Sequence, residues 1–413
     1  MSTEPQSQSP RFRRRADALL AGGMLDAAAE AYAELLDTDP EDAGALFGLT
    51  RLALGLGQGE DAAALLVRAR DVDPRSAEGP LLEGLLAEGR GDIDGAADAY
   101  RLAVQADPSA FEPRLHLGRL LASRGEAGSG WVGEALPALE RAVELRPDHA
   151  GAWYVLGVAR ARAGNDAGAA VDALALAVAV DPTFVDGYLT LADVLCAAGR
   201  RGAALEVLER ARVVCPEAAA VLGKLAAVHL ALGDLASAAA ALRRRALLDP
   251  ADADAHAHLV TVSLAASDPA GASSAADTFV DLHPGDWRGW WLRSKLFDMA
   301  DRPARAVADL RRASDLAPGA WQPWNDLGTL LNARAAAGDG PAAKEAVEVL
   351  ERAVATAPGG EDAPAYNLAL ALWNAGRTAD AGSVFGEDPR PVADALHPSA
   401  RTDELRASLA GAL

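Results

Sequence analysis

The sequence has little that would support a disulfide-linked, metal-bound or membrane-spanning protein. Its 413 residues include two cysteines, Cys196 and Cys215, which do not form a Cys-x-x-Cys pair. A disulfide framework and a structural zinc site are therefore excluded, and a reducing cytoplasm is the simplest setting. No stretch approaches the roughly 18 apolar residues of a membrane helix. Gly22, Gly23 and Asp26 interrupt the first apolar run too early for a secretory signal.

Positive charge and aromatic side chains are also scarce. Lysine and arginine are so outnumbered that the formal net charge is -20, and only 5% of residues are aromatic. Nucleic acid and anionic membrane both require a positive face, so neither is expected as the main partner. Half of the residues are hydrophobic, most of them Ala, Leu and Val. Because Ala and Leu favour helices, this composition argues against an all-β fold.

Prolines recur at a regular interval along nearly the whole chain. Most successive members of the series are 34 residues apart, and the series is Pro40, Pro74, Pro108, Pro147, Pro182, Pro216, Pro250, Pro284, Pro318 and Pro358. Such a period indicates a repeat array rather than several globular domains. Because proline cannot continue a helix, each one is expected to end a helix and to set the angle to the next.

Each repeat reads as two helices when its proline is numbered 32. Position 4 is often large, as in Trp153, Trp290 and Trp324, and positions 7 and 8 are Leu-Gly in several units. Glycine at position 8 would allow the second helix to approach the first closely, and a glycine near position 15 would close the first helix. Ser267 and Asp301 replace that second glycine in two units.

This pattern resembles the tetratricopeptide repeat, with Trp153-x-x-Leu156-Gly157 and Trp324-x-x-Leu327-Gly328 as its clearest matches. The resemblance implies an all-α fold, an α-α superhelix or right-handed solenoid of antiparallel helix pairs. It covers residues 9–390 in eleven units that begin near 9, 43, 77, 111, 150, 185, 219, 253, 287, 321 and 363. Residues 1–8 are expected to be a disordered tail, and residues 391–413 to include a capping helix.

Two units are stretched between their first and second helices, by Gly125–Gly133 and by Ala335–Pro341. Their Gly, Ser and Asp content is typical of flexible connectors. Trp131 lies in the first insertion and has two interpretations. Either it folds back and covers a helix, or it grips a partner.

By the same resemblance, the first helices line a concave groove and present positions 2, 5, 6, 9, 12 and 13 to it. The N-terminal part would present charged and aromatic residues including Arg13, Asp17 and Phe47. The middle part would be apolar and include Leu81, Leu82, Leu85 and Tyr154. The C-terminal part would be polar and comprise Arg288, Trp291, Lys295, Gln322, Asn325, Thr329, Asn332, Asn367 and Asn374.

The asparagines repeat at the same two unit positions. Asn325 and Asn332 are seven residues apart, as are Asn367 and Asn374, so each pair lies on one helix face. An amide donates and accepts, and it can therefore pair with peptide backbone of any sequence. The alternative is that these amides are solvated or bond locally. The apolar middle likewise either packs between neighbouring first helices or receives an amphipathic helix of a partner.

Patterns for catalysis or cofactor binding are missing. There is no phosphate-binding Gly-x-x-x-x-Gly-Lys motif and no Gly-x-Ser-x-Gly elbow. His229, His256 and His258 are better explained as core or boundary residues than as metal ligands. Arg243, Arg244 and Arg245 read as a solvated outer face that pairs with carboxylates.

The sequence therefore predicts a non-catalytic scaffold or adaptor without cofactor or metal, which binds a partner protein or peptide and assembles, escorts or helps to mature a complex. The alternative is a peptide-sensing module that regulates a separate DNA-binding or enzymatic partner. The partner's identity and the oligomeric state are not encoded in any motif.

Overall fold

The computed structural model describes residues 9–124, 131–164, 166–359 and 361–385. Across these ranges the chain forms twenty-two α-helices and no β-strand. The expected tail (1–8) and C-terminal capping helix (391–413) lie outside the described residues. The predicted all-α class of antiparallel helix pairs is confirmed.

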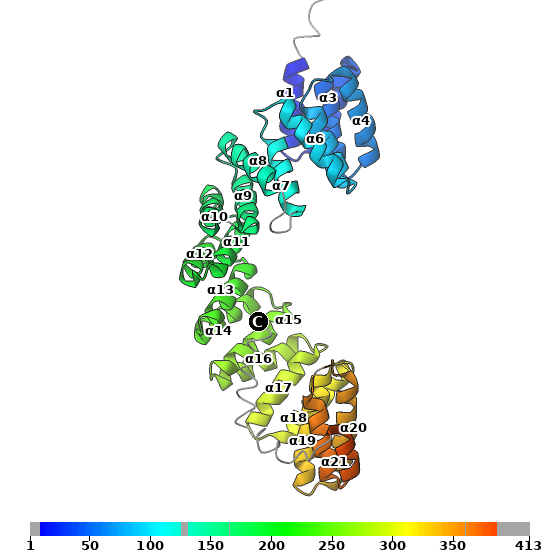
Figure 1. Ribbon diagram of the computed structural model, residues 1–413, viewed down its shortest axis with the longest axis vertical. Helices are drawn as coiled ribbons and strands as arrows, with labels where there is room; N and C mark the ends of the chain where they lie inside the picture. The colour runs from blue at the N-terminus through cyan, green and yellow to red at the C-terminus, as the bar shows by residue number, and fades with distance from the viewer. Residues whose placement is uncertain (1–8, 125–130, 165, 360, 386–413) are drawn as a thin grey trace, which may run out of the picture. The chain divides into compact units, whose positions relative to one another are not determined.

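The chain divides into two compact units, residues 1–200 and 201–413. In each unit the helices follow one another in chain order, and each packs on its neighbours in sequence (Figure 1). The helices of the first unit are α1 (Ser9–Ala21), α2 (Leu25–Thr38), α3 (Ala43–Gly55), α4 (Gly59–Val72), α5 (Glu78–Gly89), α6 (Ile93–Ala106), α7 (Glu112–Arg124), α8 (Val132–Leu145), α9 (Ala150–Ala163), α10 (Ala167–Val180) and α11 (Val185–Ala197).

The second unit continues the same alternation. Its helices are α12 (Arg201–Val214), α13 (Ala219–Ala231), α14 (Leu235–Leu248), α15 (Ala253–Ala265), α16 (Pro269–Leu282), α17 (Trp287–Met299), α18 (Pro303–Leu316), α19 (Trp321–Ala336), α20 (Gly340–Thr356), α21 (Ala363–Asn374) and α22 (Thr378–Phe385). Odd-numbered helices are the first helices of the repeats, and each begins at, or one residue after, a unit start expected from the sequence.

The repeated proline ends the second helix as its chemistry requires. Helix α2 stops at Thr38, and Asp39 then adopts extended backbone (φ −141°, ψ 92°) before Pro40. Asp181 before Pro182 has the same conformation (φ −123°, ψ 96°). The residue before a proline is disfavoured in the helical region, so the second helix ends at a fixed point in each repeat.

Close packing inside a repeat depends on glycine at position 8. A methyl group on Gly157 would lie 2.5 Å from Leu174 Cγ, and one on Gly84 would lie 2.4 Å from Tyr100 Cε1. Leu174 and Tyr100 belong to the second helix of the same repeat and are fully buried. Glycine is therefore required where the second helix presses a bulky side chain onto the first, as the sequence predicted.

In three repeats, tryptophan at position 4 bonds the first helix to the turn before it. The indole Nε1–H groups of Trp153, Trp290 and Trp324 donate to the carbonyl oxygen of the proline six residues earlier, at 2.9, 3.0 and 3.1 Å. Only Trp324 is fully within the core, at 7% exposure. This bond links the end of one repeat to the start of the next.

Two residues adopt the left-handed backbone conformation in place of glycine. Gly164 and Gly233 have φ of 71° and 78° where the first helix ends, and Ser267 and Asp301 have φ of 58° and 54° at the equivalent points. This region costs about 1–2 kcal/mol for a residue with a side chain. The turn between the helices thus keeps its geometry even where its residue is unfavourable.

The insertion at Ala335–Pro341 differs from the expected flexible connector. Helices α19 and α20 span 16 and 17 residues, whereas α17 and α18 span 13 and 14. Six inserted residues are therefore absorbed as three more in each helix. Alanine favours helix, and Asp339 caps α20 by accepting from the Ala342 amide.

Trp131 lies in the other insertion, of which residues 125–130 are outside the described ranges. Its side chain is 8% exposed and packs in the cluster that includes Ala135, Leu139 and Leu156. The interpretation that Trp131 folds back is confirmed, and a role in gripping a partner is wrong.

Substitution of Gly157 by Ala tests the close approach of the helix pair. The added methyl group must displace Leu174, and we expect a loss of about 1–3 kcal/mol of unfolding free energy, measured by urea titration. The control is Gly202→Ala, because nothing lies within 4 Å of the new methyl group and alanine favours helix, so stability should not fall. Equal effects of the two changes would contradict the packing role.

Ser267→Gly tests the strained turn after α15. Glycine removes the left-handed penalty, and we expect a gain of about 1 kcal/mol in unfolding free energy. The reverse change, Gly233→Ala, should lose a similar amount, since its methyl group meets nothing within 4 Å. No gain in the thermal unfolding midpoint of the Ser267 variant would show that the backbone there is not strained.

Candidate partner-binding surface

Polar side chains from three successive first helices meet on one surface of the second unit. We call this surface the asparagine face. Helices α19 and α21 pack directly against each other, and a hydrogen bond joins α17 to α19. The asparagine face comprises Trp291 and Lys295 of α17, Asn325, Asp326 and Asn332 of α19, and Asn367 and Asn374 of α21.

The asparagines of α19 and α21 bond to each other at two levels. Asn367 Nδ2 donates to Asn325 Oδ1 at 2.7 Å, and Asn374 Nδ2 donates to Asn332 Oδ1 at 3.2 Å. Asn325 and Asn332 are each 8% exposed, whereas Asn367 is half-buried and Asn374 is exposed. The inner pair therefore holds the outer pair, and the outer amides keep hydrogen-bonding capacity toward solvent.

Asp326 joins α17 to this row. Its Oδ2 accepts from Trp291 Nε1 and from Lys295 Nζ, both at 2.8 Å. The Lys295 ammonium also lies 4.5 Å from the centre of the Trp291 ring, which is a favourable cation–π distance. All three side chains are half-buried. Asp326 thus fixes the indole and the ammonium in one orientation.

Asp326 was not among the residues expected from the sequence. It follows Asn325, and it lies 35 residues after Trp291 and 31 after Lys295. Arg288 and Asp254 are similarly 34 apart, as are Arg311 and Glu345. A separation near 34 places two residues at equivalent positions of adjacent repeats. Opposite charges at that spacing were therefore the sequence signal that could have identified Asp326.

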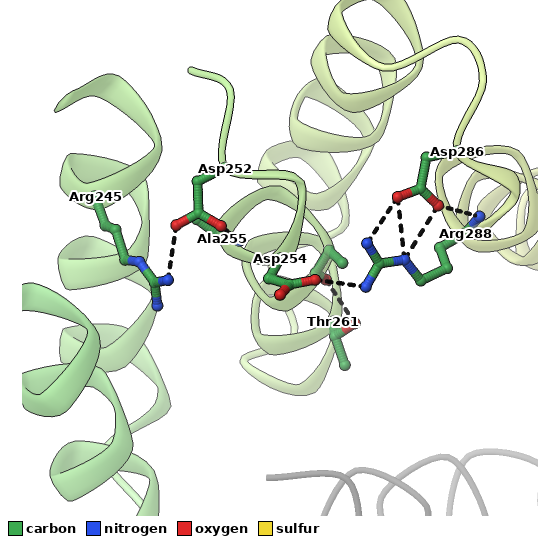
Figure 2. A network of polar contacts seen from close by, with 8 residues as sticks. Arg245, Asp252, Asp254, Ala255, Thr261, Asp286 and Arg288 are labelled. Atoms are coloured by element: carbon green, nitrogen blue, oxygen red, sulfur yellow. Dashed lines mark hydrogen bonds and ion pairs between the residues drawn. The ribbon is translucent and has the colours of Figure 1, made fainter. Parts of the chain in front are cut away.

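Arg288 is held by two carboxylates. Its Nε and Nη2 donate to Asp286, and its Nη1 donates to Asp254 at 2.6 Å (Figure 2). These hydrogen bonds, that of Asp286 first, raise the pKa of Arg288. Burial alone would raise the pKa of Asp286, but the bonds from Arg288 bring it below its usual value. A partner's carboxylate would have to compete with both acids for this arginine.

Two further polar residues expected on the C-terminal first helices, Thr329 and Gln322, lie apart from the paired amides. Thr329 Oγ1 donates to the backbone oxygen of Asp326 at 2.8 Å. Gln322 is half-buried in the first turn of α19. Neither joins the row of paired amides, although both lie on the helix that carries it.

The apolar middle is largely packed. Leu82 of the apolar middle is 1% exposed, and Phe47, expected in the N-terminal part of the groove, is 2% exposed; both belong to one core cluster. Their expected exposure to a groove is wrong, because α3 and α5 contact each other directly and close over these positions. Leu81 and Leu85 are half-buried against the cluster around Tyr100.

Tyr154 also lies between neighbouring helices rather than open to solvent. Its ring meets Phe184 edge to face at 5.1 Å, and its hydroxyl accepts from Thr190 at 3.4 Å. For these residues the structure favours the interpretation that neighbouring first helices pack together.

His256 is likewise packed between helices. His256 is 3% exposed, its ring is stacked on Phe279, and its pKa is lowered by burial. Among the described residues, no group of three or more His, Cys, Asp or Glu side chains is arranged to hold a metal ion. No helix within the described ranges is long and apolar enough to cross a membrane.

Stacked helix pairs with polar side chains gathered on the first helices define an α-helical repeat protein of the kind that serves as a protein-interaction scaffold. Three family models, each described as tetratricopeptide repeat, match residues 19–88, residues 120–183 and 259–320, and residues 185–228. Together these ranges cover more than half of the chain. The chain therefore belongs to the tetratricopeptide repeat family. The asparagine face extends beyond them, because the matches end at residue 320.

Solved structures of similar fold include MamA, which is 26% identical with a TM-score of 0.37 over 41% of this chain and 96% of that one. Yeast Tom70 is 12% identical, with a TM-score of 0.39, and the match covers 99% of this chain and 96% of Tom70. YrrB, described as a TPR protein with an unusual peptide-binding site, is 24% identical, with a TM-score of 0.38. The match covers 47% of this chain and 97% of YrrB. A search of curated proteins found no match.

Asp326→Ala tests the link between α17 and α19. The change leaves the Trp291 indole and the Lys295 ammonium without their acceptor, and we expect a loss of about 1–2 kcal/mol of unfolding free energy. Asp326→Asn should lose less, because its amide oxygen still accepts from Trp291. Urea unfolding followed by circular dichroism measures both; identical stability of the Ala variant and the wild type would contradict the link.

Proposed function

We propose that the asparagine face binds an extended segment of a partner protein, and that the chain acts in a reducing cytoplasm as a non-catalytic adaptor. In this role it would assemble, escort or help to mature a complex. The observation that carries the proposal is the two-level pairing of amides on α19 and α21, which leaves the outer asparagines held in place at the surface.

The amide geometry suits peptide backbone. Each outer asparagine uses one Nδ2 hydrogen on its inner partner, which leaves its carbonyl oxygen and second hydrogen for a ligand. Asn367 and Asn374 lie seven residues apart on α21, a separation of about 10 Å along a helix axis. Three residues of an extended chain span the same length, so both amides can bond one peptide.

The neighbouring side chains add a second kind of contact. The Trp291 ring has Trp287 at 5.8 Å and Lys295 over its face. Its indole nitrogen is fixed by Asp326, so the ring does not lose further rotational freedom when a partner binds. An aromatic surface next to backbone-binding amides favours a segment with an apolar side chain at that end.

The proposal is tested with a peptide selected from a displayed library of random 15-residue peptides on the full chain. Asn367→Ala with Asn374→Ala removes about two hydrogen bonds, and we expect affinity to fall at least about tenfold by calorimetry. The matched control is Gln58→Ala with Gln105→Ala, which removes two exposed amides, one just before α4 and one on α6, and should leave affinity unchanged. Equal affinity of the asparagine variant and the wild type would refute the site.

A further inference from the structure

The outward surface of two second helices combines arginine with exposed aliphatic side chains. On α14, Arg243, Arg244 and Leu247 are exposed, and Leu247 reaches 75%. On α12, Arg210 and Val213 occupy the same positions one repeat earlier, and Val213 is 73% exposed. We call these five residues the basic outer face. Both helices pack on α13, so their equivalent positions repeat along the stack.

Charge in this part of the chain is opposite to that of the whole. Residues 200–248 contain eight Lys or Arg and four Asp or Glu, although the chain has a net charge of -20. Arg245 pairs with Asp252 at 2.7 Å (Figure 2). In contrast, Arg243 and Arg244 form no ion pair with any residue in the described ranges. The expectation that this arginine run is neutralised by carboxylates therefore holds for Arg245 alone.

Helix α2, the second helix of the first repeat, carries the opposite charge. Residues 16–50 contain eight Asp or Glu and no Lys, Arg or His. Four of these acids, Asp26, Glu30, Glu34 and Asp37, are exposed on α2. Their spacing places them on one side of the helix, and we call them the acidic outer face. Met24 and Leu25, at its N-terminal end, are 54% and 38% exposed.

The two faces match by charge rather than by apolar contact. On α14, Leu247 lies one turn after the two arginines. On α2, Met24 precedes the helix, and Leu25 lies on the side away from Glu30. The contact is therefore expected to depend on the arginines and the carboxylates.

We propose that the basic outer face of one copy docks the acidic outer face of a second copy, so that the chain associates with itself. Different surfaces meet on the two copies, and such a contact either occurs twice in a closed dimer or extends into a ring or an open chain. The contact uses second helices and leaves the asparagine face, on first helices, open to a partner. It thus stands independently of the proposed peptide binding.

Sedimentation velocity of the full chain tests the association. At low ionic strength the weight-average sedimentation coefficient should rise with protein concentration, and the rise should weaken when added salt screens the charges. A monomer at every concentration would overturn the proposal. Binding of vesicles with anionic headgroups by a chain that stays monomeric would overturn it too, and would assign the arginines to lipid.

Charge exchange identifies the two surfaces. Arg243→Glu with Arg244→Glu, or Glu30→Arg with Glu34→Arg, should each raise the dissociation constant at least about tenfold, because like charges then meet. Mixing the two variants, or combining all four changes in one chain, should restore association. The altered side chains are exposed, and circular dichroism checks that each variant folds.

The matched control is Arg68→Glu with Arg312→Glu, which changes the net charge by the same amount at exposed positions on α4 and α18. This variant should associate as the wild type does. Loss of association in the control as strong as in the α14 variant, or failure of the four-change chain to recover, would overturn the assignment to these two faces.

Discussion

A pair of helices only 13 or 14 residues long cannot bury its apolar side by itself, and this constraint determines how the rest of the chain is arranged. Each pair must stack on the next, so the residues that meet are those about one repeat apart. Arg288 with Asp254 and Arg311 with Glu345 show the result, since both pairs are separated by 34 residues. The period in the sequence is thus also a period in space.

The constraint also explains why the insertion near residue 338 leaves the stack intact. Asn325 and Asn367 are 42 residues apart, yet they occupy the same repeat position and bond to each other. Lengthening α19 and α20 by equal amounts moves the turn outward along the pair and leaves its base unchanged. If only one helix had taken up all six residues, it would extend past its partner by about 9 Å.

Local features of the fold were predictable because each depends on one residue and its own repeat. Proline ends a helix wherever it stands, and a position-8 glycine is required where Leu174 or Tyr100 presses on it. The burial of Leu82 and the position of Asp326 were not predictable in this way. Both depend on contacts between the first helices of two different repeats, and such contacts leave no trace in a single unit's pattern.

The asparagine face also combines features that one repeat predicts with contacts between repeats that it does not. The asparagine positions were predicted from repeat numbering, but their mutual hydrogen bonds were not, since amide pairing requires direct packing of α19 on α21. This packing decides the chemistry of the surface. Charged side chains in place of the inner pair at 8% exposure would need desolvation and a counter-ion. Amides satisfy one another at little cost and still present donors and acceptors outward, so the surface can be polar without favouring either charge. In a chain whose carboxylates far outnumber its basic groups, such a neutral surface reduces the electrostatic repulsion that an acidic partner segment would otherwise meet.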